Sequence, residues 1–444
     1  MKITNELHEE SIQALHRLIN CPSFNTSDGL TNPPFGEGIQ LCLEEALAIC
    51  EELGMTTYLD PAGFYGYGDY GSGADLIGVL CHLDVVPAGD LALWKSDPFH
   101  AVTKDGIIYG RGSQDDKGPT IASLYAFKAV VDAGYTFNKR IRFVFGTDEE
   151  TLWRCMAAYN QKEEAPTMGF VPDGTFPLVY AEKGLLQVVL KGAGSSELAL
   201  VCGDAFNVVP GKADYQGDKA EAVQAQLAKK AIQSDLQGNM VTVTGKAVHT
   251  SLANTGMNAI NLLAQGLVTE YSHSVLDFLT EKVGNEANGA SIFGEIKDEV
   301  SGELTFNVGL VEINPAFSEI KIDMRVPVTI DKEILATKLA EVASDYQLEY
   351  HEFDYVPSLY VPKDTALIET LLSVYREATG DLTEPIVSGG ATFARTMKNM
   401  VAFGAHFPDS IGLAHQVNEG LVLSELYKAT EIYAETIKTL CCDK

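Results

Sequence analysis

Short apolar runs alternate with helical patterns through the first 180 residues, and few folds accommodate such an order. "LIGVLCHLD" (76–84), "RIRFVFGTDEE" (140–150) and "MGFVPDG" (168–174) are predicted strands, while "TIASLYAFKAVVDAG" (120–134) is a predicted helix. Strands that alternate with helices are typical of a mainly parallel sheet with helices on its faces. The first part of the chain is therefore predicted to form an α/β domain, which helices at 5–20 and 36–54 precede.

The pattern changes near Lys183. Alternating strands with some helices between them are typical of an α+β domain on an antiparallel sheet, and they are predicted at 185–192, 239–250, 304–313 and 319–328. After about residue 357 the earlier pattern returns, with a helix at 364–379, the strand "MVAFGAH" at 400–406 and a closing helix from about 422.

A chain of 444 residues is too long for one comfortable core, so more than one domain is expected. We predict an α/β fold class with a mainly parallel-sheet catalytic domain formed by residues 1–182 and 357–444. The segment 183–356 is predicted to be an inserted α+β lid domain.

Composition excludes several classes of partner. The formal net charge of −29 would repel phosphate backbones, so no nucleic-acid partner is expected. No eighteen apolar residues follow one another, so neither a membrane span nor a membrane partner is expected. The opening "MKITNELHEE" is too charged for a signal peptide, and the eight cysteines include no C-x-x-C pair. These features predict a cytoplasmic protein.

Acidic and histidine side chains lie at or just beyond the ends of the predicted strands. His82 and Asp84 are two residues apart, so on one strand they point to the same side and can act on the same object. Open α/β sheets bind ligands at the carboxyl ends of their strands. The candidates that gather there are His82, Asp115, Glu150, Asp173 and His415.

Two imidazoles and three carboxylates form a ligand set that suits zinc, manganese or cobalt. Five ligands are too many for one tetrahedral zinc with an open position, but they suit two metals if one carboxylate bridges. Such a pair lies about 3.5–4 Å apart and can hold a hydroxide between the ions. Asp84 would then accept the free N–H of His82 and fix its tautomer. Glu149 would take a proton from the bound water and deliver it to the leaving amine.

Each motif alone also has an ordinary explanation. An H-x-D at a strand end is more often a hydrogen-bonded surface pair, "DDKG" (115–118) a solvated turn, and Glu149-Glu150 an exposed pair. Five such sites in one predicted sheet are hard to explain by solvation. Neither a G-x-S-x-G nucleophile elbow nor a G-x-x-x-x-G-K-[ST] phosphate loop is present as an alternative.

Seven motifs together resemble the dinuclear metallopeptidase family that includes carboxypeptidase G, aminoacylase and the peptidase V dipeptidases. They occur in that family's order over nearly the whole chain: "HLDVVPAGD", "GRGSQDDKGPT", "GTDEE", "VPDG", "GKAVH", "IDMR" and "AHQVNE". The long predicted lid and "AEKG" (181–184) are most similar to the peptidase V branch.

The resemblance implies a role for each candidate. His82 and Asp173 would hold one metal, Glu150 and His415 the other, and Asp115 would bridge the two. Glu149 would be the general base and Asp84 the support for His82. From the lid, the resemblance implies that His249 stabilises the oxyanion, that Arg325 grips a substrate carboxylate and that Asn207 holds substrate.

The family points to a metal-dependent dipeptidase with two divalent ions per chain, which we expect to be zinc, with manganese and cobalt also compatible. An N-acyl amino acid deacylase or a carboxypeptidase of the same family is the alternative, and a non-catalytic metal or peptide binder is a third. The expected partner is a small peptide substrate. Because the long lid suggests that one chain supplies His249 to its own site, a monomer is expected.

Two departures from the family pattern affect the substrate site. Val248 and Thr250 flank His249, where the family often has small residues, and "GDLALWKSDPF" (89–99) is longer or more apolar than the usual link. Neither departure removes a ligand or the base, so neither favours the binder.

Overall fold

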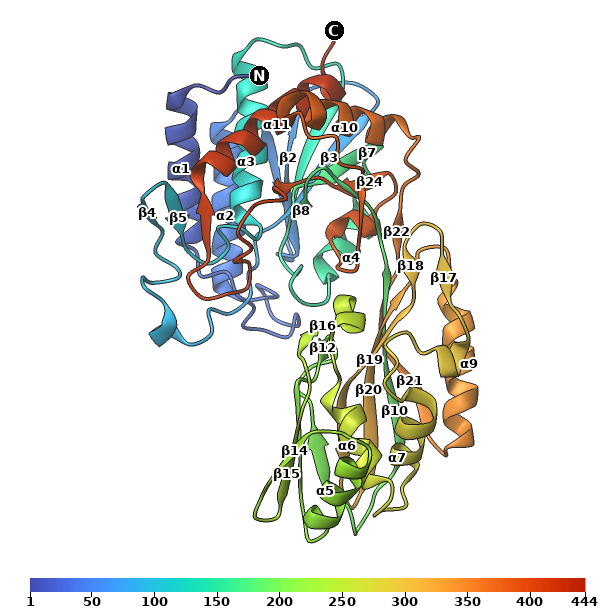
Figure 1. The fold of residues 1–444 in the computed structure, drawn as a ribbon. Helices are drawn as coiled ribbons and strands as arrows, with labels where there is room; N and C mark the ends of the chain where they lie inside the picture. The colour runs from blue at the N-terminus through green and yellow to red at the C-terminus, as the bar shows by residue number, and fades with distance from the viewer. Residues whose placement is uncertain (444) are drawn as a thin grey trace. The chain divides into compact units, whose positions relative to one another are not determined.

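The computed structural model describes residues 1–443, which form two compact units (Figure 1). The first unit comprises Met1–Tyr180, Val361–Ile386 and the chain from Thr392 onward. The second comprises Ala181–Tyr360 and the short segment Val387–Ala391. The catalytic and lid roles of these units remain a prediction.

A parallel set of strands forms the centre of the first unit, as expected. β3 (Leu76–His82) pairs in parallel with β6 (Arg140–Gly146) and β7 (Met168–Val171), and β7 pairs in parallel with β24 (Met400–Ala402). The strand order is β1-β2-β6-β3-β7-β24-β9-β22. Every residue of β3 is buried, which is typical of a central strand with both faces covered. The predicted α/β fold class with an α+β insert is confirmed.

Antiparallel strands complete this sheet at its two sides. β1 (Thr56–Leu59) and β2 (Tyr65–Tyr70) form a hairpin beside β6, and β23 (Ile386–Ser388) pairs with β9. β9 (Val179–Glu182) also pairs with β22 (Leu359–Tyr360), with Ala181 opposite Tyr360 and Glu182 opposite Leu359. The two ends of the second unit's long segment therefore lie side by side.

Helices pack on the sheet of the first unit, and the sequence explains why two of them, α1 and α3, form. α1 (Asn5–Ile19) begins after Thr4, whose hydroxyl accepts the Leu7 N–H at 3.2 Å. α3 (Lys117–Asp132) packs against α1 and α11 and is buried nearly all round, which suits its apolar composition. The remaining helices are α2 (Glu37–Glu52), α4 (Arg154–Lys162), α10 (Ala366–Thr379) and α11 (Leu423–Cys441).

The second unit is built on a five-stranded antiparallel sheet with the order β11-β19-β20-β10-β21. Its strands are β10 (Gly184–Ala193), β11 (Leu200–Cys202), β19 (Thr305–Ile313), β20 (Phe317–Val326) and β21 (Glu349–Val356). An apolar core joins this sheet to helices α5 (Ala220–Lys229), α6 (Ala259–Leu267) and α9 (Lys332–Asp345). A three-stranded sheet, in the order β13 (Lys212–Gln216), β15 (Met240–Thr244) and β14 (Ser234–Gln237), packs on α5 and α6.

Smaller elements complete the fold. β12 (Val208–Val209) pairs with β16 (Val248–His249), and β26 (Gly420–Val422) pairs with β5 (Ile107–Tyr109). Within the described residues, no helix has both the length and the apolar character that a membrane crossing needs.

Candidate metal centre

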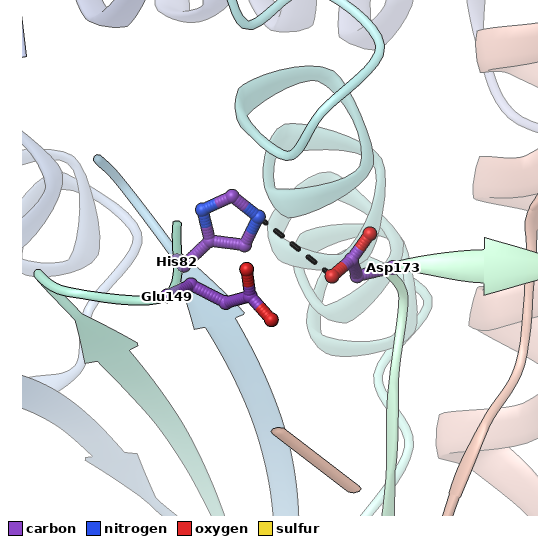
Figure 2. A group of neighbouring side chains, drawn as sticks. All are labelled: His82, Glu149 and Asp173. Atoms are coloured by element: carbon purple, nitrogen blue, oxygen red, sulfur yellow. Dashed lines mark ion pairs between the residues drawn. The ribbon is translucent and has the colours of Figure 1, made fainter. Parts of the chain in front are cut away.

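His82 is the last residue of β3, and its ring faces two carboxylates. The Nε2 atom lies 2.9 Å from Oδ1 of Asp115 and 3.7 Å from Oδ2 of Asp173. Figure 2 shows the ring, Asp173 and Glu149 turned toward one another. One ligand atom from each of these three side chains lies within 4.8 Å of the others. The carboxyl end of a central strand thus carries one half of the candidate centre, as the sequence predicts.

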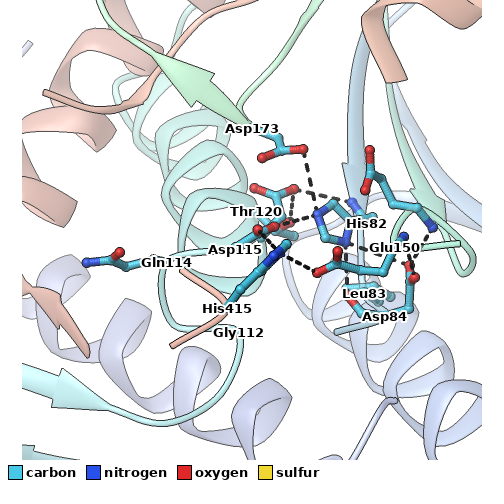
Figure 3. Close-up of polar contacts among 12 residues, drawn as sticks. His82, Leu83, Asp84, Gly112, Gln114, Asp115, Thr120, Glu150, Asp173 and His415 are labelled. Carbon is cyan, nitrogen blue, oxygen red and sulfur yellow. Dashed lines mark hydrogen bonds and ion pairs between the residues drawn. The ribbon is translucent and has the colours of Figure 1, made fainter. Parts of the chain in front are cut away.

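Asp115 lies between two imidazoles. Its Oδ1 atom faces His82, and its Oδ2 atom lies 2.9 Å from Nε2 of His415 (Figure 3). His415 comes from the loop before β26 and has a φ of 64°, a left-handed conformation that histidine rarely adopts. One carboxylate therefore presents a separate oxygen to each ring, as a bridging ligand would.

Glu150 completes the second half of the centre. Its Oε1 atom lies 3.1 Å from Nε2 of His415. The same oxygen is buried and makes no hydrogen bond of acceptable geometry among the described residues. Asp115, Glu150 and His415 each offer one ligand atom within 4.8 Å of the others.

The donor set and its spacing fit divalent metals. Ligand atoms that each lie about 2.1 Å from one ion are about 3.0–3.4 Å apart at octahedral or tetrahedral angles. The distances between the imidazole nitrogens and the carboxylate oxygens here run from 2.9 to 3.7 Å. All the donors are nitrogen or oxygen, which suits zinc, manganese or cobalt. The residues present therefore fit a bound metal.

The carboxyl groups and imidazoles of the centre strongly perturb one another. Burial, with a contribution from nearby carboxylates, raises the pKa of Glu149, Glu150 and Asp173. Burial also disfavours ionised Asp115, but hydrogen bonds from His415 and His82 outweigh it and lower the pKa of that carboxyl. Asp115 and Glu150 raise the pKa of His415 to about 10. Several buried carboxylates so close together favour the binding of a cation.

Asp84 makes a different contact from the one expected. Nδ1 of His82 lies 2.9 Å from the main-chain carbonyl of Asp84, while the nearest carboxylate oxygen of Asp84 is 3.7 Å from Nδ1. The carboxylate instead accepts the main-chain N–H groups of Glu149 and Glu150, each at 3.0 Å. The carbonyl fixes the His82 tautomer with Nε2 free to act as a ligand. The Asp84 side chain holds the turn that carries the two glutamates.

Glu419 is a site residue whose role the sequence did not reveal. It is fully buried, and its carboxylate accepts a hydrogen bond from Nη1 of Arg111 at 2.7 Å. The same carboxylate accepts the main-chain N–H groups of Gly112, Gln114 and Asp115 at 2.8–3.3 Å. It therefore holds the loop of Asp115 to the loop of His415.

Gln114 reinforces this connection from the other side. Its side-chain amide donates to the carbonyls of Ile411 and Gly420 at 2.9 and 2.8 Å and accepts the Leu413 N–H at 2.7 Å. The loop of Asp115 and the loop of His415 are thus joined by both side chains. The acidic residue in "NEG" (418–420) stands just before a strand, a position that could have marked Glu419 as a candidate. Nothing in the sequence indicates that it contacts the loop of Gln114, 305 residues earlier.

The three candidates from the predicted lid, Asn207, His249 and Arg325, all belong to the second unit. His249 ends β16, and its Nδ1 atom accepts the Ser251 N–H at 3.2 Å and lies 2.8 Å from the Ser251 hydroxyl. Because Nδ1 is an acceptor, the ring proton is on Nε2. The carbonyl of Asn207 accepts the Thr250 N–H at 2.9 Å, so Asn207 is tied directly to the residue after His249.

Arg325 lies on β20, buried and already paired. Its Nε and Nη2 atoms lie 2.8 and 3.1 Å from the carboxylate of Asp323, and Nη1 donates to the carbonyl of Gly389 at 3.0 Å. A Cβ atom on Gly389 would stand 2.6 Å from Cβ of Ser251, so glycine allows this close approach. The Gly389 segment thereby links Arg325 to the Ser251 that contacts His249.

Comparison with known proteins identifies the family of this chain and solved structures that share its fold. A family model described as peptidase family M20/M25/M40 matches residues 78–439. The chain is 37% identical over 431 residues to a Bacillus subtilis (strain 168) protein named "Putative dipeptidase YtjP", with 92% of each chain covered. Human carnosine dipeptidase 1 has a TM-score of 0.61 at 14% identity, with 97% of this chain and 95% of that chain covered.

A second solved structure has a different printed activity. The M20 family metallo-carboxypeptidase Sso-CP2 from Sulfolobus solfataricus has a TM-score of 0.60 at 18% identity, with 97% of this chain and 98% of that chain covered. At these identities both solved structures show a shared fold.

Proposed function

Because this chain belongs to peptidase family M20/M25/M40, we propose that it is a dipeptidase that hydrolyses free dipeptides with two divalent metal ions. The family resemblance found in the seven sequence motifs is confirmed. One observation carries the two-metal proposal: the two oxygens of Asp115 each lie 2.9 Å from a different imidazole nitrogen. The name of the Bacillus subtilis relative supports the choice of dipeptides.

Five side chains would hold the metals. His82 and Asp173 would bind one ion, Glu150 and His415 the other, and Asp115 both. We propose zinc, with manganese and cobalt compatible with the same donors. When bound, such ions would supply an activated water and polarise the scissile carbonyl.

Glu149 is proposed as the general base. Its carboxylate is grouped with His82 and Asp173, and burial raises the pKa of its carboxyl well above the ordinary value. A raised pKa brings a carboxylate closer to the range in which it can accept a proton and then release it. Glu149 would take a proton from the attacking water and deliver it to the departing amine. Asp84 would keep Glu149 in place through the main chain.

The second unit is proposed to supply the substrate groups. His249 carries its proton on Nε2, where it can donate to a developing oxyanion. Arg325 would bind the carboxylate of a dipeptide. Its hydrogen bonds to Gly389 and Asp323 engage one N–H on each Nη atom, which leaves the other N–H of each Nη atom for a substrate. Asn207 would contact the substrate beside His249.

The deciding experiment is chelation followed by separate addition of zinc, manganese or cobalt. Hydrolysis of a dipeptide panel, including one Xaa-His dipeptide, should disappear on chelation and return with at least one metal. The same dipeptides with an acetylated amine are the matched controls and should be poor substrates. Preference for the acetylated forms would instead indicate an N-acyl amino acid deacylase. Activity that survives complete metal removal would contradict the proposal.

Two further properties are proposed with this function. All eight cysteines are buried and without a disulfide in the described structure, which suits a reducing cytoplasm. We also propose a monomer, because the long inserted segment suggests that one chain supplies His249 to its own site. A mass of two chains in light scattering would contradict the proposed monomer.

A further inference from the structure

Asn307 is a buried amide in the centre of the second unit. It lies on β19 opposite Asp323 of β20, and its side chain is 3% exposed. Its Nδ2 atom donates to the carbonyls of Phe206 and Val208 at 3.1 and 2.9 Å, the two residues on either side of Asn207. The same atom lies 3.1 Å from Oγ1 of Thr250, the residue after His249. One amide thus reaches both segments that carry proposed substrate groups.

The orientation of this amide is fixed by its surroundings. Oδ1 of Asn307 accepts Nδ2 of Asn258 at 3.1 Å. Asn258 also donates to the carbonyl of Val308 at 2.8 Å, and its own oxygen caps α6 by accepting the Ile260 N–H at 3.0 Å. If the Asn307 amide were flipped, its Nδ2 would face the Nδ2 donor of Asn258. Its Oδ1 would face the carbonyl oxygens of Phe206 and Val208. In the observed orientation Nδ2 faces only acceptors and Oδ1 faces a donor, so this orientation is the favoured one.

The two substrate segments also pair with one another through the main chain. β12 and β16 pair over two residues, Val208 with His249 and Val209 with Val248. The Thr250 N–H also donates to the Asn207 carbonyl at 2.9 Å, and the Gly245 N–H donates to the Gly211 carbonyl at 2.8 Å, where the two segments continue into the ladder of β13 and β15. The amide from β19 adds a contact to each segment from a rigid sheet.

We propose that Asn307 is a positioning residue that sets Asn207 and His249 relative to one another for the reaction. This inference rests on the proposed function of those two residues. An apolar side chain would fill the same core volume without the cost of burying an amide. The hydrogen bonds of Asn307 are directed at the substrate segments, which explains why a polar residue occupies this place.

The kinetic test uses Asn307→Asp in the full-length, metal-loaded protein. Aspartate has nearly the same volume and keeps an oxygen for Asn258, but it replaces the donor with an acceptor that faces two carbonyls. We expect kcat/KM for a dipeptide to fall by roughly 10–100-fold, mostly in kcat, because misplaced groups slow the chemical step. Bound metal should not change. Asn261→Leu is the control, since Asn261 is equally buried on α6 and its oxygen has no hydrogen-bond partner among the described residues.

A double-mutant cycle separates positioning from general destabilisation. If Asn307 acts through His249, the Asn307→Asp change should cost much less in a His249→Ala background than in the wild type. An equal cost in both backgrounds would overturn the inference while leaving dipeptidase activity intact. Thr250→Val, which removes one contact without burying a charge, should give a smaller loss of the same kind if Asn307→Asp does not fold.

A second readout does not depend on catalysis. Hydrogen exchange of peptides covering 205–210 and 248–256 should be faster in Asn307→Asp, or in Thr250→Val, than in the wild type and in Asn261→Leu. Unchanged exchange in both peptides would overturn the inference even if no dipeptide were hydrolysed. Absence of hydrolysis by the wild-type protein would instead count against the proposed function.

Discussion

At the scale of single residues, substitution of Glu149 distinguishes a loss of the chemical step from a loss of metal binding. It lies beside His82 and Asp173, whereas the atoms that span the two halves of the centre belong to Asp115. Glu149→Gln should lower kcat by about 10²–10⁴-fold, the usual contribution of a general base, with metal content unchanged. Steady-state kinetics and elemental analysis of the same sample test this. Near-normal turnover would remove Glu149 as the base.

Glu419 should matter for stability and for metal affinity together. Glu419→Gln leaves Arg111 buried without its charged partner, and breaking a buried pair in this way costs about 3–5 kcal/mol. Thermal unfolding should show a large loss, and metal titration should show weaker binding because the Asp115 loop is released. The matched control is Glu52→Gln, which breaks an exposed pair with Arg17 and should cost less than about 1 kcal/mol. Equal losses in both variants would contradict the role of Glu419.

His249 should be neutral at physiological pH. Partial desolvation, and then the charge of Arg325, lower the pKa of its ring below 6.5. A lowered histidine pKa means that the unfolded chain binds the proton more readily. The contribution of His249 to the free energy of unfolding is therefore complete above about pH 6.5 and is lost as the pH falls through 6.5 toward the folded pKa. An NMR titration of the ring in folded and urea-unfolded protein measures both values, and a folded pKa above the unfolded one would contradict the prediction.

The sequence located the ligand-type residues better than their supports. His82, Glu150 and Asp173 lie at the carboxyl ends of predicted strands, so strand ends alone predict that they converge. The contact of Asp84 with the main chain of Glu149 and Glu150 depends on how tightly the turn after β6 closes, which strand periodicity does not describe. The proposed metal-binding roles themselves remain predictions.

At the scale of elements, glycines decide where several strands end. The strand predicted at 239–250 is divided in the structure into β15 (Met240–Thr244) and β16, and Gly245 lies at the break. A Cβ atom at Gly245 would stand 2.1 Å from the Met257 carbonyl. Alternation of apolar residues predicted one strand, because it does not report such close backbone contacts. The predicted strand 400–406 is divided in the same way into β24 and β25 (Ala405–His406), and Gly404, between them, has a φ of 70°.

Gly245→Ala should therefore be costly. The new methyl group collides with backbone, which cannot move as a side chain can, so we expect a loss of about 1–3 kcal/mol or more in the free energy of unfolding. Denaturant unfolding measures it. Gly412→Ala is the control, because a Cβ atom there meets nothing within 4 Å. A neutral Gly245→Ala would show that the close approach is not maintained in solution.

The start of α3 shows the opposite case, in which a helix extends beyond its prediction. The helix was predicted from residue 120 and begins at Lys117, so it includes Pro119. Proline lacks an N–H, but the first turn of a helix has no internal partner for that group. This early start places the first turn of α3 directly after Asp115 and Asp116.

At the scale of the whole molecule, the proposed ligands all belong to one of the two compact units. Metal should therefore stabilise the first unit directly, by about 2.7 kcal/mol when its free concentration is a hundred times the dissociation constant. Chelation should lower the unfolding temperature and speed hydrogen exchange in β3 and β6. Peptides from β19 and β20 are the internal control. Faster exchange in both units to the same degree would contradict a metal centre confined to the first.

The order of an α/β part, an α+β insert and a return to α/β was visible in the sequence because strand and helix periodicities differ. The short segment Val387–Ala391 was not visible as part of the second unit. Its membership depends on single contacts, such as that of Gly389 with Arg325, rather than on any pattern of its own. Local periodicity cannot report contacts between distant segments.

The pairing of β9 with β22 has a consequence for how such a chain can diversify. Ala181 and Tyr360 are opposite each other, so the long insert leaves and rejoins the host at points about one strand spacing apart, near 4.8 Å. Whatever is inserted there needs only two adjacent ends, and the host sheet is not required to change. The paired strands therefore form an insertion point. A domain inserted there can be exchanged or enlarged while the strands that carry the proposed ligands keep their sequence order.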